Sequence, residues 1–182
     1  REPEGISSAR TGFSNTPPSI VNFGKEMFLQ MPKIKTSSGI TMYYEQHGQG
    51  PDLLLISGLS ASCMAWRSVL EPLSRKYRVT VFDNRGAGQT ETPPGPYTVE
   101  IMAHDTVSLM DALGIEQSNI IGHSMGGMIL QELCLSYPEK VSKAIMNAST
   151  SAIPLYSMNH IMSVAKLWES GAPLETIIEI VF

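Results

Sequence analysis

Short apolar runs alternate with amphipathic stretches along the middle of the chain, beginning near residue 52. The run DLLLIS is apolar between its two ends, which is typical of a parallel strand covered on both faces. Four runs predict strands and three stretches predict helices: strands at 52–57, 78–83, 118–123 and 141–149, helices at 65–77, 98–114 and 125–138. Strands that alternate with helices imply right-handed crossovers. We therefore predict an α/β protein with a doubly wound, mostly parallel sheet.

The two ends of the chain differ from this alternating part. Residues 1–30 carry Pro, Ser, Asn and Gly without periodicity and are predicted to be a loose N-terminal extension. Residues 31–50 favour two short strands joined by a Ser-Ser-Gly turn, and they complete a predicted core over 31–150. Residues 151–182 have helical patterns and no further strand. One hypothesis is that Met31 is the natural start, which mass spectrometry of the native N-terminus tests.

Composition narrows the possible partners. The 182 residues are 42% hydrophobic, and the net charge is -4 without a cluster of Lys and Arg, so we expect neither nucleic acid nor a membrane surface as partner. No apolar run reaches the roughly 18 residues that span a bilayer. Cys63 and Cys134 are too few for a disulfide framework, and Cys134 is predicted to be a reduced core thiol. We expect a cytoplasmic protein without a metal site, because no His, Cys and carboxylate ligands cluster.

The segment NIIGHSMGGMIL places a serine where a predicted strand becomes a predicted helix. Ser124 lies between Gly122 and Gly126 in a G-x-S-x-G pattern. A sharp turn of this kind projects a hydroxyl clear of the sheet, and the two glycines relieve the crowding of the backbone. The helix that follows directs its N-terminal dipole at developing negative charge. Ser124 is therefore predicted to be a nucleophile on an elbow; an ordinary buried serine in a tight turn is the alternative.

With these motifs in this order, the chain from about Ile34 to Ser149 resembles the α/β-hydrolase fold. DLLLISGLSAS is similar to the third strand and the loop after it, and the block that begins VFDNRGAGQT is similar to the fourth strand and onward. Within the fold the chain most resembles esterases and enol-lactonases, with some likeness to carbon–carbon bond hydrolases and perhydrolases. The resemblance implies a serine hydrolase without a cofactor. An aspartate nucleophile would instead indicate a dehalogenase or an epoxide hydrolase.

The resemblance also implies an oxyanion hole. One donor would be the backbone N–H of Met125, which follows the nucleophile, and the other the N–H of Leu59 in the loop after the third strand. In the family a His-Gly pair precedes this second donor, and the pair here is Ser57-Gly58. The family histidine supports the loop and donates no proton to the substrate. Its replacement puts the rigidity of the loop in question and leaves the role of the Leu59 N–H unchanged.

Other polar residues are interpreted as structural. Asp83 and Arg85 belong to a loop that shapes the floor of the pocket in the family, and His123 is too close in the chain to turn onto Ser124. Neither His104, in the middle of a predicted helix, nor His47, in a predicted turn, resembles a general base. The methionines are expected to fill the core: Met102, Met110, Met128 and Met146.

A serine hydrolase of this fold needs an acid and then a histidine after the nucleophile. No aspartate follows Ser124, and His160 is the single histidine there, in the region where the family places its mobile cap. The remaining carboxylates are Glu132, Glu139, Glu169, Glu175 and Glu179. The triad acid and histidine are thus absent from residues 1–182, and we expect a chain truncated at the start of a helical cap, with an exposed sheet edge that favours self-association.

The leading functional hypothesis is a serine hydrolase that cleaves small carboxylic esters or lactones through an acyl-enzyme on Ser124. As a fragment without acid and base it is expected to be inactive or very slow. The alternative is a non-catalytic ligand-binding or signalling protein that uses the hydrolase pocket as a receptor.

Overall fold

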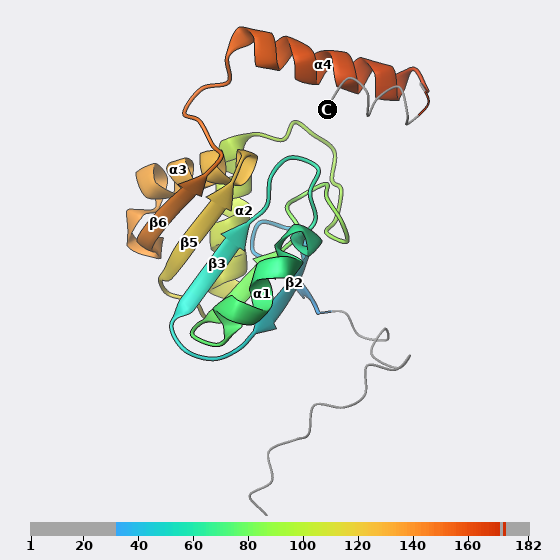
Figure 1. The fold of residues 1–182 in the computed structure, drawn as a ribbon. Coiled ribbons are helices and arrows are strands. Elements are labelled where there is room, and N and C mark those ends of the chain that lie inside the picture. Colours follow the sequence, from blue (N-terminus) through green and yellow to red (C-terminus); the bar gives the residue numbers. More distant parts are fainter. Residues whose placement is uncertain (1–31, 172, 174–182) are drawn as a thin grey trace, which may run out of the picture. The chain divides into compact units, whose positions relative to one another are not determined.

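A computed structural model describes residues 32–171 and residue 173 (Figure 1). The extension predicted over residues 1–30 and the end of the predicted cap region, 174–182, lie outside the described residues. The elements in chain order are β1 (Lys33–Lys35), β2 (Thr41–His47), β3 (Asp52–Ile56), η1 (Cys63–Trp66), α1 (Arg67–Ser74), β4 (Arg78–Phe82), α2 (Val99–Ala112), β5 (Ser118–His123), α3 (Met125–Ser136), η2 (Pro138–Lys140), β6 (Val141–Asn147) and α4 (Leu155–Glu169).

The strands form one sheet in the order β1-β2-β4-β3-β5-β6. β4, β3, β5 and β6 run parallel, and β2 is antiparallel to both β1 and β4. The mostly parallel sheet predicted from the alternating pattern is therefore confirmed. Residues 33–47 also form the predicted pair of short strands, closed by a hydrogen bond from the Thr36 N–H to the Ile40 carbonyl (3.0 Å).

Helices cover both faces of the sheet. Figure 1 shows α1 in front of the strands and α2 and α3 behind them. α2 begins at the predicted cap, where the Thr98 hydroxyl accepts a hydrogen bond from the Ile101 N–H (3.3 Å). The interior between sheet and helices is apolar, as the continuous runs predicted; its buried members include Leu54, Ile56, Phe82, Leu109, Met110, Ile120, Ile129, Leu130 and Leu133.

Two of the sequence predictions are wrong. Met146 was expected in the core, but its side chain is 45% exposed, because β6 pairs with β5 alone in the described part of the chain and most of its residues reach solvent. His47 was expected in a turn, but it ends β2, where it lies opposite Val79, and its Nε2 is 2.8 Å from the Glu45 carboxylate. Met102 and Met110 do fill the core, as predicted.

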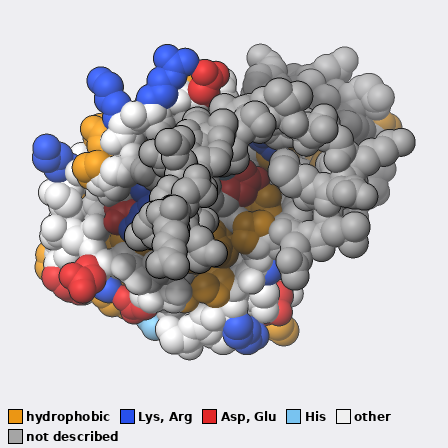
Figure 2. All heavy atoms as spheres, turned by 90° about the horizontal axis from the view of Figure 1, so that it is seen from below, with side chains coloured by type: hydrophobic (Ala, Val, Ile, Leu, Met, Phe, Trp, Pro, Cys, Tyr) orange, Lys and Arg blue, Asp and Glu red, His pale blue; other side chains and the backbone are white. Residues whose placement is uncertain are grey.

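The described surface carries charges of both signs. In the view of Figure 2, Lys and Arg side chains are spread among Asp and Glu side chains rather than gathered in one basic patch. Among the helices within residues 32–171, none combines the length and the apolar surface that a membrane crossing requires.

A buried ion pair joins the loop after β4 to α2. The Arg85 guanidinium donates two hydrogen bonds to the Asp105 carboxylate (2.6 and 2.8 Å), and the two side chains are only 11% and 2% exposed. The hydrogen bonds to Asp105 raise the pKa of Arg85, and the Tyr97 ring lies 5.6 Å from the guanidinium carbon. This pair holds the loop against the helix, which agrees with the structural interpretation of Arg85.

We expect Asp105→Ala to lower the free energy of unfolding by about 3–5 kcal/mol, because it leaves a buried guanidinium without its partner. The matched control is Glu71→Ala, which breaks the exposed Glu71–Arg75 pair on α1 and should change stability by about 0.5 kcal/mol or less. Urea denaturation of both variants measures the difference. Equal effects would contradict a structural role for the buried pair.

Candidate active site

Ser124 occupies a sharp turn between β5 and α3. Its backbone angles are φ 53° and ψ -120°, a positive-φ conformation that non-glycine residues rarely adopt. The turn is held by hydrogen bonds from the Ser124 N–H to the Asn147 carbonyl and from the Gly127 N–H to the Ser124 carbonyl (both 2.9 Å). Ser124 is exposed at the carboxyl edge of the sheet. The predicted strand-to-helix elbow with a strained backbone is therefore present.

The two elbow glycines are required by close approach of backbone to backbone. A Cβ on Gly122 would collide with the Gly126 carbonyl and lie 2.7 Å from the Gly127 Cα. A Cβ on Gly126 would collide with the Ile56 carbonyl and lie 2.8 Å from the Ser57 carbonyl oxygen. The first turn of α3 thus packs directly on the ends of β5 and β3, as the spacing of the glycines predicted.

The loop after β3 passes beside Ser124. A Cβ on Gly58 would lie 3.2 Å from the Ser124 Cβ, so the loop backbone runs alongside the serine just before Leu59. Within the described residues, the N–H groups of Leu59 and Met125 donate no hydrogen bond to a protein acceptor. Met125 is the first residue of α3, where N–H groups lack helical partners. The two predicted donors therefore have no protein acceptor among the described residues; Met125 follows Ser124 in the chain, and Leu59 follows Gly58, whose backbone adjoins the Ser124 side chain.

Residues that follow β4 anchor this loop. The Asp83 carboxylate accepts hydrogen bonds from the N–H groups of Cys63 (2.7 Å) and Gln89 (2.8 Å), and the Asn84 amide donates to the Ser57 carbonyl (3.0 Å). Burial and the nearby negative charge of Asp83 raise the pKa of the Cys63 thiol to about 12, so this cysteine stays a thiol at neutral pH. Asp83 is structural, as interpreted from the sequence.

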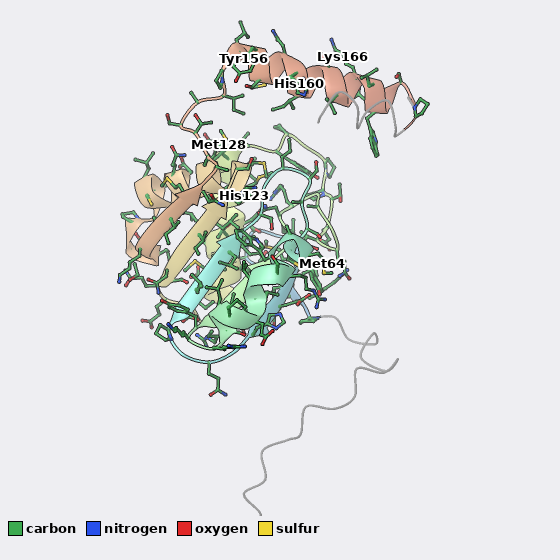
Figure 3. The ribbon with its side chains drawn as sticks, in the orientation of Figure 1. Met64, His123, Met128, Tyr156, His160 and Lys166 are labelled. Carbon is green, nitrogen blue, oxygen red and sulfur yellow. The ribbon has the colours of Figure 1, made fainter. Side chains whose placement is uncertain are left out.

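No histidine of the described chain is hydrogen-bonded to the Ser124 hydroxyl. His123 lies at the carboxyl end of β5 (Figure 3), with its Nδ1 3.3 Å from the Asn147 amide nitrogen and its ring edge-on to Trp66. His104 is exposed on α2, and His160 is exposed on α4. Among the carboxylates after the serine, Glu132 accepts a hydrogen bond from Ser136 on its own helix. Within residues 32–171, the Ser124 hydroxyl is therefore not hydrogen-bonded to an acid–base pair.

A cavity of about 240 Å³ opens beside the elbow. Its lining includes Gly58, Trp66, Val69, His123 and Asn147, so it lies between the loop after β3, the start of α1 and the ends of β5 and β6. Sequence reasoning missed Trp66 and Asn147 at this site, because neither belongs to a motif. Within the described residues, no group of three or more His, Cys, Asp and Glu side chains is placed to hold a metal ion.

The chain belongs to the α/β-hydrolase fold family, whose profile matches residues 51–169. A protein described as a carbamate hydrolase, RutD, from Azorhizobium caulinodans is 37% identical over 107 residues, which cover 58% of this chain and 40% of that protein. Epoxide hydrolase 2 from Siraitia grosvenorii is 38% identical over 117 residues, 63% of this chain and 37% of that protein. The crystal structure of the enol-lactonase from Burkholderia xenovorans superposes with a TM-score of 0.67 at 27% identity, covering 71% of this chain and 52% of that one.

These relatives are hydrolases, and this chain is identified as a member of the same hydrolase family. The chain spans about half or less of the length of the relatives it matches. The matched part contains the elbow and the loop after β3, the two segments that meet at Ser124.

We expect Ser124→Gly to stabilise the 182-residue chain by about 1 kcal/mol, because glycine adopts a positive φ without the Cβ strain. Ser124→Ala keeps the Cβ and serves as the control, with stability close to that of the parent chain. Thermal unfolding followed by circular dichroism measures both. A Ser124→Gly variant no more stable than Ser124→Ala would contradict strain at the elbow.

We expect Gly126→Ala to destabilise the chain by about 3 kcal/mol or more, since its methyl group meets the backbone of Ile56 and Ser57. Gly39→Ala is the control, because a Cβ there has no atom within 4 Å and only the positive φ of 87° opposes it. That substitution should cost about 1 kcal/mol. Similar losses for the two variants in urea denaturation would show that the close approach at Gly126 is unimportant.

Proposed function

We propose that this chain supplies the nucleophile and the oxyanion hole of a serine hydrolase that acts on small carboxylic esters or lactones. The observation that carries the proposal is the exposed Ser124 at φ 53°, with the free N–H groups of Leu59 and Met125 in its neighbourhood. Acyl transfer needs a nucleophile beside donors that bind the developing oxyanion, and the placement of Ser124 supports its assignment as that nucleophile.

In the proposed reaction the Ser124 oxygen attacks the acyl carbon and forms a tetrahedral intermediate. The Leu59 and Met125 N–H groups hold its oxyanion, and each donor is worth about 3–4 kcal/mol of the barrier. Collapse of the intermediate releases the alcohol and leaves an acyl-enzyme on Ser124, which water hydrolyses to the carboxylic acid. Both steps require a base: it takes the proton of Ser124 and gives it to the departing alcohol oxygen, and then takes a proton from water and returns it to the Ser124 oxygen.

The similar proteins support hydrolysis as the class of reaction, but they support no particular substrate. Their names include a carbamate hydrolase and an enol-lactonase, whose reactions also release a group from an acyl carbon. An epoxide hydrolase is among them as well. In this fold an epoxide hydrolase would be expected to carry an aspartate as nucleophile at the elbow. The serine at position 124 therefore favours acyl transfer over epoxide opening.

A second candidate is a non-catalytic ligand-binding protein that uses the same pocket, and it is compatible with the contacts of Ser124 in the described residues. Within residues 32–171, neither a histidine nor a carboxylate is hydrogen-bonded to the Ser124 hydroxyl, and the neighbouring His123 contacts Asn147 instead. A serine hydroxyl without a base is a weak nucleophile. In such a protein the free N–H groups would bind an anionic or carbonyl oxygen of a ligand without turnover.

The test uses the natural protein, isolated as its organism produces it. The protein is assayed for hydrolysis of p-nitrophenyl acetate and for reaction with a fluorophosphonate probe. We expect ester hydrolysis, probe labelling at Ser124 found by peptide mass spectrometry, and loss of at least about 10³-fold in kcat for Ser124→Ala. The 182-residue chain alone should turn over slowly at best, through its oxyanion donors.

Substitution of His160 tests whether this histidine acts as the base in the 182-residue chain. We expect His160→Ala to leave the slow rate of the 182-residue chain unchanged. A fast rate for that chain, lost on His160→Ala, would mean that the histidine of α4 serves as the base. A natural protein that binds esters but neither hydrolyses them nor reacts with the probe would support the binding protein instead.

A further inference from the structure

The Ser57 side chain connects two parts of the site that the motifs leave unexplained. Its hydroxyl accepts a hydrogen bond from the Trp66 indole Nε1–H (3.0 Å) and donates one to the Ser62 carbonyl (3.3 Å). Ser57 is only 1% exposed, so these partners replace water completely. Both contacts cross the base of the loop 58–62, which carries Leu59.

The same loop is tied at other points by backbone groups. The Ala61 N–H donates to the Gly58 carbonyl (3.3 Å), and Ser60 has a positive φ of 57°. The anchors on Asp83 and Asn84 described above hold the two ends of the loop. Within residues 57–62, Ser57 is the one side chain that the structure shows hydrogen-bonded to another side chain.

We propose that Ser57 is a positioning residue, which with Trp66 holds the loop so that the Leu59 N–H points at the oxyanion. This inference rests on the proposed function, since it assigns a role within the same site. Leu59 follows directly on Gly58, whose backbone adjoins the Ser124 side chain, so a small shift of the loop moves the donor relative to the serine. The Trp66 ring also contacts the His123 ring in an edge arrangement, which links η1 to the carboxyl end of β5.

The two hydrogen bonds of Ser57 require a side chain that is both a donor and an acceptor. Ser57 must accept from the indole and donate to a carbonyl at the same time, and a hydroxyl is the small group that does both. An alanine would leave the buried indole N–H and the Ser62 carbonyl without this partner. A donor displaced by about 1 Å loses on the order of a hundredfold in rate.

The kinetic test compares Ser57→Ala and Trp66→Phe in the natural protein with p-nitrophenyl acetate. Trp66→Phe keeps an aromatic ring but removes the N–H donor together with part of the ring volume that lines the cavity. We expect each variant to lower kcat about tenfold to a hundredfold with KM within about twofold, because the Leu59 N–H acts mainly in the transition state. The double variant should be no slower than Ser57→Ala, since both single changes remove the same Ser57–Trp66 hydrogen bond.

Ser62→Ala is the matched control. It lies in the same loop, but its contribution is the backbone carbonyl, which the substitution retains. We expect kcat and KM of this variant to equal those of the parent. Unchanged kcat in both Ser57→Ala and Trp66→Phe, with folding verified by circular dichroism, would overturn the inference. So would additive losses in the double variant.

A second measurement does not depend on activity. In the 182-residue chain, ¹⁵N relaxation of the Leu59 amide should give an order parameter near 0.85, which falls below about 0.6 in Ser57→Ala and Trp66→Phe but not in Ser62→Ala. An unchanged order parameter would overturn the inference even if kcat fell. Should the natural protein fail to hydrolyse esters, the proposed function fails, and the order parameter alone decides whether Ser57 positions the loop.

Discussion

The site depends on one close approach of backbone to backbone, between the first turn of α3 and the ends of β3 and β5. At Gly122 and Gly126 there is no room for a Cβ, so the helix begins against the sheet and Ser124 is forced into a positive φ. The strain is stored where the hydroxyl must leave the sheet, and the surrounding hydrogen bonds to Asn147 and Gly127 maintain it. Exposure of the serine and freedom of the Met125 N–H both follow from this arrangement.

A second group of contacts brings the other donor to the same place. Asp83 and Asn84 follow β4, which lies beside β3, so their side chains reach the loop that leaves β3. The adjacent order of parallel strands thus explains why a loop after one strand is anchored by residues after the next. Ser57 and Trp66 complete the support from the side of η1. The proposed oxyanion hole is therefore a product of strand order as much as of the motif around the serine.

Much of this was predictable from the sequence, for physical reasons. Continuous apolar runs predicted the parallel strands, and the spacing of Gly122, Ser124 and Gly126 predicted the elbow, because local sterics determine both. The contacts between Ser57 and Trp66 and between Arg85 and Asp105 were not predictable, since each joins residues that no local period relates. The exposure of Met146 was missed for a similar reason: an apolar residue in a strand is buried only if something covers that strand.

The central claim is that Ser124 becomes covalently acylated during ester cleavage. The most direct measurement is rapid-quench peptide mass spectrometry of the natural protein mixed with an excess of a short p-nitrophenyl ester. We expect an acyl group on the peptide that contains Ser124, formed within the first turnover and absent from Ser124→Ala. Hydrolysis of the ester with no acyl group on that peptide, or with an equal amount on Ser124→Ala, would contradict the claim.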